Sequence, residues 1–175
     1  VNREFSDVTA EYEMKWAAIE RTRGVPNYAA GDAIVSHAMA SGLFERVNQH
    51  EPTNPPGNGL SCAVWADQVT PTESGLDATS ALIVFRVRIY SSMLQQPQDA
   101  IDPNVLNALD VLWAAYIGDY TLGGLVKNVD VRGMSGVRLS AQAGYVNTPT
   151  AGGPQMRVMT ITLPVQLNDI WTEAP

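Results

Sequence analysis

The chain has 175 residues, a net charge of −7 and a pI near 4.7, and only 17% of its residues are charged. This length predicts one folded domain. The acidic balance argues against tight binding to the phosphate backbone of nucleic acids, which requires clustered Lys and Arg. Because few charges are available to coat a surface, we expect other subunits to cover part of it.

A single cysteine, Cys62, lies in an apolar run. One cysteine cannot form an internal disulfide or a Cys-based zinc site, so we interpret it as a small buried hydrophobic residue. No run approaches the ~18 apolar residues of a membrane span, so no membrane partner is expected. The amino terminus lacks the pattern of a signal peptide, and we expect assembly in the cytoplasm.

Helical periodicity appears first in residues 6–23 and is interrupted at Gly24. It predicts an N-terminal helical arm over residues 1–24, followed by one domain over residues 25–175. A second helix is predicted from Ala30 or Asp32 to Val47, because its apolar residues form one stripe.

A third helix is predicted to begin at Asp102, as an acidic N-cap, with Pro103 at its first helical position. Its large apolar residues recur at helical spacing, and Gly118 would supply the C-cap. The stripe requires this helix to pack on a sheet or on another helix.

The strongest strand pattern covers residues 81–90, where apolar residues alternate with Val84, Arg86, Arg88 and Tyr90. Both arginines therefore project from the face opposite the core, and we predict that they pair with acidic groups of a neighbouring subunit. A shorter strand is predicted over residues 61–66.

The last third of the chain predicts strands over residues 125–131, 137–145 and 156–167, joined as an antiparallel meander. Pro164 cannot donate to a ladder, so the end of the last strand is predicted to be a sheet edge. The fold class is therefore α+β, a mostly antiparallel sheet of about five strands with two main helices packed on one face.

Three polar segments are predicted to be long loops that contact neighbouring subunits or other partners: residues 48–60, 67–79 and 146–155. Long irregular loops inside a compact domain are uncommon unless they are functional or disordered.

No constellation of residues indicates catalysis or a cofactor. His37 falls in the second helix, as a surface or partner-facing residue, and His50 lies in a loop without spaced metal ligands. Ser135 is in a tight Gly-bearing turn without the strand–turn–helix context of a nucleophile elbow. We therefore predict no catalytic, cofactor-binding or metal-binding residues, and no enzyme activity.

Residues 84–90, residues 101–124, and residues 129–133 with Gly144, Tyr145 and residues 157–165 form a set of stretches in a fixed order. As a set they resemble the tail terminator (tail-completion) proteins of long-tailed bacteriophages. The resemblance extends from about Pro26 to Trp171 and does not include the N-terminal arm.

The resemblance implies a structural virion protein at the head–tail junction. Such a protein forms a homo-hexameric ring that caps the tail tube, ends its polymerisation and joins it to the head connector. Its partners would be other copies of itself, the major tail tube protein and the connector or stopper protein. Genomic DNA would pass through the acidic bore without specific binding. The alternatives are a neck or stopper ring, and a small-molecule-binding α+β domain or hydrolase.

Overall fold

The computed structural model describes residues 29–51, 59–74, 78–147 and 155–172. The N-terminal arm predicted over residues 1–24 lies outside the described residues, and the domain boundary stays a prediction. Two long helices and one sheet make up the described part. The helical elements are α2 (Ala29–Ala40), the 3-10 turn η2 (Gln98–Ala100) and α3 (Ile101–Gly118). The strands are β1 (Arg46–Asn48), β2 (Leu60–Glu73), β3 (Ala78–Ser92), β4 (Asn128–Val129), β5 (Ser140–Asn147) and β6 (Gln155–Thr172).

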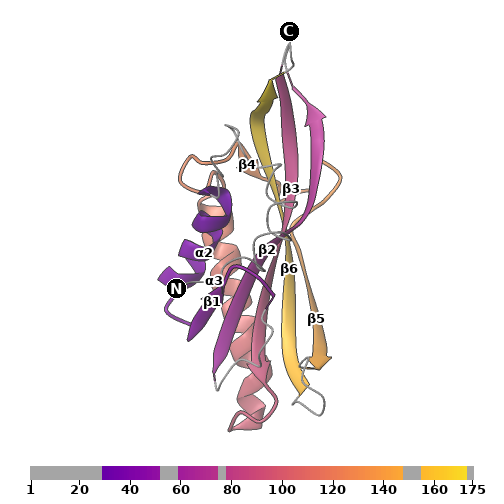
Figure 1. Cartoon of the computed structure of the whole chain (residues 1–175). Coiled ribbons are helices and arrows are strands. Elements are labelled where there is room, and N and C mark those ends of the chain that lie inside the picture. The colour runs from indigo at the N-terminus through magenta and orange to yellow at the C-terminus, as the bar shows by residue number, and fades with distance from the viewer. Residues whose placement is uncertain (1–28, 52–58, 75–77, 148–154, 173–175) are drawn as a thin grey trace, which may run out of the picture.

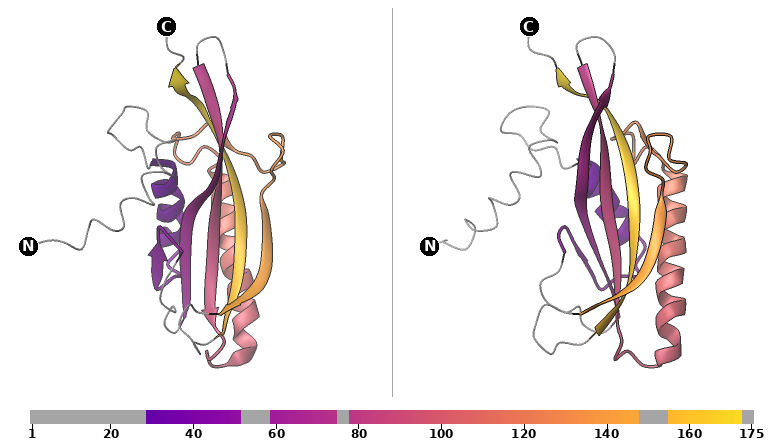
Figure 2. Two further views of the ribbon diagram at one scale, coloured as in Figure 1. Left: turned by 45° about the vertical axis from the view of Figure 1, so that its right-hand side comes forward. Right: turned by 90° about the vertical axis from the view of Figure 1, so that its right-hand side faces the viewer.

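The described strands form a six-stranded sheet in the order β1-β2-β3-β6-β4, and β5 also pairs with β6. Every pairing is antiparallel except that of β1 with β2. Both helices cover one face of the sheet (Figures 1 and 2). The predicted α+β class is therefore confirmed. The meander is wrong in one respect, because β4 pairs with β6 and not with β5. Within the described residues, no helix is long and apolar enough to span a membrane.

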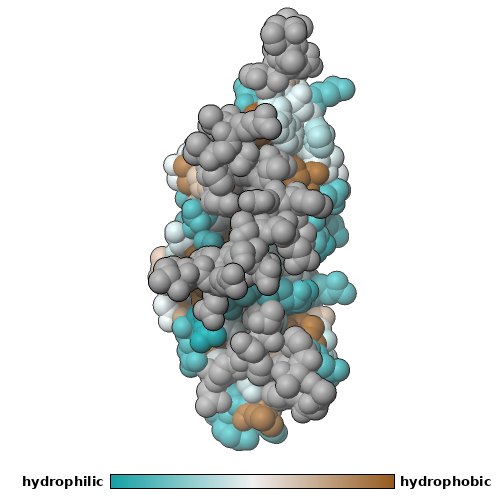
Figure 3. Space-filling view, viewed as in Figure 1, coloured by the Kyte–Doolittle hydropathy of each residue, from teal (hydrophilic) through white to brown (hydrophobic). Residues whose placement is uncertain are grey.

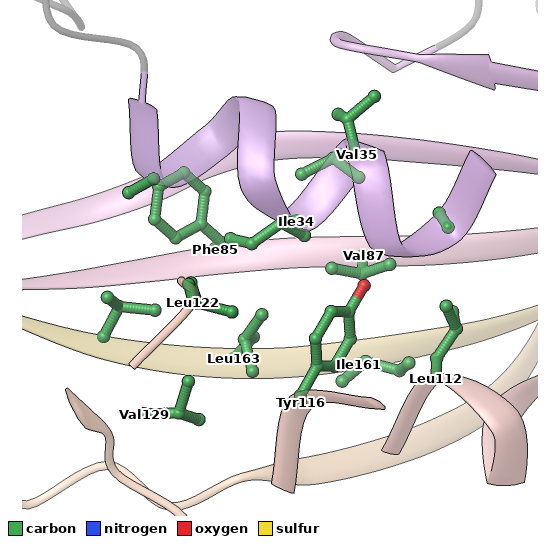
Figure 4. Close-up of a cluster of buried hydrophobic side chains, with 14 of the residues drawn as sticks. Ile34, Val35, Phe85, Val87, Leu112, Tyr116, Leu122, Val129, Ile161 and Leu163 are labelled. Carbon is green, nitrogen blue, oxygen red and sulfur yellow. The ribbon is translucent and has the colours of Figure 1, made fainter. Parts of the chain in front are cut away.

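The core lies between the sheet and the two helices. Ile83, Phe85, Val87 and Ile89 alternate along β3 and are completely buried, as the pattern of this strand predicts. Figure 4 shows Ile34 and Val35 of α2 and Leu112 and Tyr116 of α3 directed toward the same cluster. Each large side chain buried here contributes ~1.5–3 kcal/mol of transfer free energy. This core fixes the middle of β2, β3 and β6, whose far ends project beyond the helices (Figure 1).

Helix α2 is shorter than predicted. It ends at Ala40, because Gly42 adopts a left-handed φ of 67° and the Ser41 hydroxyl donates to the Ala38 carbonyl. The predicted helical continuation to Val47 is therefore wrong. Val47 belongs to β1, where it pairs with Cys62 in a parallel register.

Strand β2 continues to Glu73, so the loop predicted over residues 67–79 is wrong for most of its length. A bulge between Ala66 and Gln68 shifts the register, and beyond it β2 continues to pair antiparallel with β3 up to Glu73. Pro71 is tolerated here, since β1 pairs only with residues 61–63 and leaves the distal part of β2 at the sheet edge within the described residues. The predicted contacts of the three loops with neighbouring subunits stay predictions.

Pro164 is not at a sheet edge, contrary to the prediction. It pairs with Val84 on one side, and its carbonyl accepts the Asp130 N–H on the other. The two backbone groups of one residue point to the same side of an antiparallel strand, so the nitrogen of Pro164 also faces that second side. On that side, β5 pairs with β6 up to Thr162, and β4 pairs with β6 at Val165 and Gln166. The Pro164 nitrogen lies between these two pairings, so its lack of an N–H removes no hydrogen bond of the sheet.

Helix α3 begins one residue before the predicted N-cap. Ala100 is the N-cap residue and makes no side-chain capping bond, whereas Asp102 lies inside the first turn. Asp102 instead accepts a hydrogen bond from Arg157 Nε at 2.6 Å. The helix ends at Gly118 with Asp119 as its C-cap, so Gly118 itself is helical.

Candidate functional site

A polar pocket lies where the distal ends of β2, β3 and β6 meet the segment around β4. Its volume is about 470 Å³, within the usual range of ligand sites. In the view of Figure 3, the described surface at this projecting end is mainly hydrophilic. Leu167 is the one apolar residue among the described lining residues. The polar lining residues are Thr72, Glu73, Ser74, Ser80, Lys127, Ser135, Gln166, Asn168 and Asp169.

Asp169 is placed in this pocket by an irregularity of β6. Between Thr79 and Ala81 the β3 strand advances two residues, while β6 advances four, from Trp171 to Leu167. The excess is accommodated by a φ of 51° at Asp169, a conformation that Asp tolerates better than most residues. Bulges of this kind re-aim side chains and are frequent beside functional sites.

Two hydroxyl groups hold the bulge in place. The Ser74 hydroxyl donates to Asp169 Oδ1 at 2.5 Å, and the Asp169 N–H donates to Ser80 Oγ at 3.2 Å. Contacts from Ser74, the residue after β2, and from Ser80 of β3 therefore fix the carboxylate and the backbone of Asp169. A carboxylate held in this way is ready to accept hydrogen bonds from a ligand without first being ordered.

The pocket also contains a second carboxylate and an ammonium group. Glu73 ends β2, opposite Thr79, and is exposed. The Lys127 N–H donates to the Gln166 carbonyl at 2.9 Å, which fixes its backbone beside β6. Within the described residues, the Lys127 ammonium makes no ion pair. The pocket thus offers both a free cation and anionic acceptors to a ligand.

Ser135 reaches the pocket from a turn that is organised by the buried carboxylate of Asp130. This carboxylate accepts the N–H groups of Gly133 at 2.8 Å, Met134 at 2.9 Å and Ser135 at 2.6 Å, and also the Ser135 hydroxyl. Burial alone would raise the pKa of Asp130, but these hydrogen bonds outweigh it and hold the pKa below its ordinary value of 3.8. The Gly133 N–H to Asp130 bond and the Gly136 N–H to Gly133 carbonyl bond confirm the predicted tight turn.

The arginines of β3 form ion pairs with acidic groups of the same chain, and their predicted pairing with a neighbouring subunit stays a prediction. Arg86 donates to Asp67 Oδ2 at 2.9 Å, and Arg88 pairs with Glu51 of the same chain. The Arg88 guanidinium also lies 5.1 Å from the ring centre of Trp65. These residues form a satisfied network on the sheet face away from the helices.

The histidines and the cysteine take no part in the pocket. His37 Nε2 lies 3.3 Å from Asp119 Oδ2, and its ring meets Tyr116 edge-on. His50 Nδ1 lies 2.9 Å from the Glu51 carbonyl. Cys62 is buried, as predicted, and burial raises the pKa of its thiol to about 12. The described residues contain no group of three or more side chains arranged to hold a metal ion.

The sequence prediction missed Glu73, Lys127 and Asp169 as pocket residues. Glu73 falls in a segment predicted to be a loop, and Asp169 lies beyond the predicted end of the last strand. The one available signal is the pair Asn168 and Asp169, which interrupts the apolar alternation of β6. Such an interruption is typical of a bulge.

Residues 1–50 match a family model described as glycosyl hydrolase family 10. The match contradicts the resemblance to phage tail terminators and the structural virion role that the resemblance implied. It also contradicts the expectation that the chain is not an enzyme. The match covers less than a third of the chain and ends before the pocket, so it supports a proposal without placing the whole chain in the family. A search of curated proteins finds no match. The predicted connector partners and virion location stay predictions.

Proposed function

We propose that this chain binds a saccharide in the polar pocket at the distal ends of β2, β3 and β6. The observation that carries the proposal is the lining, in which hydroxyl, amide, carboxylate and ammonium groups surround a space of about 470 Å³. A sugar presents many hydroxyl groups, each of which donates and accepts hydrogen bonds. The lining supplies both kinds of partner, whereas one apolar residue, Leu167, offers little to a hydrophobic ligand.

The polar groups are also held in advance of binding. Asp169 is fixed by Ser74 and Ser80, and Ser135 is fixed by Asp130. Rigid groups reduce the ordering cost that opposes association. The match to a glycosyl hydrolase family independently favours a glycan over another polar ligand.

Hydrolysis of a glycosidic bond is the second candidate function, favoured by the presence of two carboxylates, Glu73 and Asp169, in one pocket. β3 lies between β2 and β6, so the two backbones are separated by two strand spacings, or about 10 Å. In glycosidases the distance between the two carboxyl groups decides whether the anomeric configuration is inverted or retained.

Calorimetric titration with a panel of neutral oligosaccharides tests the binding proposal. At least one glycan should bind the full chain, and Asp169→Asn and Lys127→Met should each weaken it about tenfold. The matched control is Asp110→Asn on the exposed face of α3, which should bind as the unmodified chain does. The proposal is wrong if no glycan of the panel binds, or if the control loses as much affinity as the pocket variants.

Hydrolysis is tested separately by following the anomeric protons of the same glycans by NMR. A hydrolysis product that the unmodified chain forms and that Glu73→Gln and Asp169→Asn do not form would support the second candidate, and its anomeric configuration would show whether the reaction inverts or retains. Binding without turnover would leave a saccharide-binding role and exclude hydrolysis of those glycans.

A further inference from the structure

The polar pocket carries more negative than positive charge. Among its described lining residues, Glu73 and Asp169 are negative and only Lys127 is positive. The carboxylate of Asp130, which holds the Ser135 turn, adds negative charge behind the lining. The whole chain has a net charge of −7, so the surrounding field adds to this imbalance. The pocket therefore attracts a cationic ligand and repels an anionic one.

The positive and negative groups belong to opposite sides of the pocket. Glu73 is the last residue of β2, whereas Lys127 directly precedes β4, and the sheet order β2-β3-β6-β4 separates these strands by three spacings, about 14 Å. The Asp169 carboxylate accepts the hydroxyl of Ser74, the residue after Glu73, so its charge lies toward the β2 side. Lys127 accordingly forms no ion pair with either carboxylate. The pocket is negative toward β2 and positive toward β4.

Both carboxylates have oxygens available to a ligand. Asp169 Oδ1 accepts the Ser74 hydroxyl at 2.5 Å, and Oδ2 accepts no hydrogen bond from a described residue. Glu73 is exposed and makes no ion pair within the described residues. An ionised carboxylate accepts hydrogen bonds and cannot donate them, so both groups require a donor from the ligand. An ammonium group is the strongest such donor, because its hydrogen bonds to a carboxylate are charge-assisted.

We propose that the pocket selects a saccharide unit with a free amino group, a 2-amino-2-deoxyhexose, over the same unit with its amine acetylated. The ammonium group of the sugar lies on the β2 side, against Glu73 and Asp169, and the oxygens of the sugar lie toward Lys127. Glu73 is then the residue that determines specificity. This inference rests on the proposed saccharide site and adds the class of saccharide that the site takes.

The hydrogen-bond donors of the lining favour an amino sugar over a bare cation. Ser80 is only 6% exposed, and its Oγ accepts the Asp169 N–H at 3.2 Å. Its own O–H donates to no other group within the described residues, so this proton is available to the ligand. Lys127 is also a donor and cannot accept. A metal ion or a polyamine would leave these donors unmatched, whereas the hydroxyl and ring oxygens of a sugar accept from them.

The test compares two matched ligands by calorimetric titration of the full chain. One is an oligomer of glucosamine, and the other is the same oligomer with every amine acetylated. At about pH 6, where the amine is charged, the glucosamine oligomer should bind about tenfold more tightly. At about pH 9 the amine has lost its proton, and the preference should disappear. Spermidine, a cation without sugar hydroxyls, should bind more weakly than the glucosamine oligomer.

Three variants measure which charge sets the ratio of the two affinities. Glu73→Gln should reduce the preference for the glucosamine oligomer to about threefold or less, and Lys127→Met should increase it, because it removes a like charge from the pocket. The matched control is Asp110→Asn, which removes one exposed negative charge from α3, outside the lining, and should leave the ratio unchanged.

The possible failures can be told apart. Equal affinities of the unmodified chain for the two oligomers would overturn the amino-sugar inference while leaving the saccharide site standing. If neither oligomer binds, both the inference and the proposed function are wrong. Spermidine binding as tightly as the glucosamine oligomer, or a ratio that falls as much in Asp110→Asn as in Glu73→Gln, would reduce the preference to general attraction of cations and would also overturn the inference.

Discussion

The turn that brings Ser135 to the pocket should depend on the charge of Asp130. Replacing Asp130 by Asn keeps the shape of the side chain but leaves one acceptor oxygen in place of two. The carboxylate accepts four hydrogen bonds, two at each oxygen, so Asn loses the two that reach Ser135 or the two that reach Gly133 and Met134. Hydrogen bonds to charged groups contribute ~1.5–3 kcal/mol each, and part of the loss is recovered by relaxation. We expect Asp130→Asn to lower the free energy of unfolding by about 2–4 kcal/mol.

Urea unfolding followed by circular dichroism measures this loss as a lower midpoint at an unchanged slope. Asp110→Asn is the control, because Asp110 is exposed on α3 and should change stability by no more than about 0.5 kcal/mol. Equal midpoints for the two variants would refute the role given to the Asp130 carboxylate.

The same carboxylate sets a pH dependence. Because the folded-state pKa of Asp130 lies below its ordinary value of 3.8, the unfolded chain binds the proton more readily. The stabilisation is therefore complete above the unfolded pKa and is lost as the pH falls through the folded one. In Asp130→Asn this acid loss should be smaller than in the unmodified chain. An identical acid profile would contradict the reasoning.

Three further substitutions or treatments test the core and the turn. Tyr116→Phe should leave stability unchanged or raise it by up to about 1 kcal/mol in thermal unfolding, because the buried Tyr116 hydroxyl has no hydrogen-bond partner within the described residues. Gly133→Ala should cost about 1–3 kcal/mol in urea, since φ is 80° and a Cβ would lie 2.9 Å from Arg138 Cβ. Cys62 should resist a thiol reagent at pH 8 until urea unfolds the chain, because its thiol is buried with a pKa of about 12. A loss of stability in Tyr116→Phe, no loss in Gly133→Ala, or rapid labelling of Cys62 in the native chain would contradict the respective prediction.

The sequence predicted the core elements well, because the periodicity of apolar residues depends directly on which face is buried. The alternation along β3 and the helical spacing of Leu112 and Tyr116 are such patterns, and both elements are found where expected. Element ends were less predictable. Val47 continues the apolar spacing of α2 but pairs instead with Cys62, a tertiary contact that periodicity cannot express.

The distal sheet and its pocket could not be predicted from periodicity. Residues 67–73 are polar apart from Val69 and Pro71, so their pattern predicts a loop, and only their pairing with β3 makes them a strand. Asp169 enters the pocket because β6 has more residues than β3 between two pairs, which depends on register across strands distant in sequence. Pro164 was predicted to lie at a sheet edge because a proline lacks the N–H that a neighbouring strand needs. It lies inside the sheet because β4 and β5 leave a gap beside it, and that gap is likewise a property of the whole sheet.

The account depends most on the claim that the strand-end pocket binds a saccharide. The direct test is a titration of the full chain with the oligosaccharide panel, followed by backbone amide NMR shifts. The largest shifts should fall on residues 72–74, 80, 127, 135 and 166–169, and Asp169→Asn should reduce them while Asp110→Asn should not. No shift with any glycan, or shifts centred on the Trp65 and Arg88 network instead, would contradict the claim.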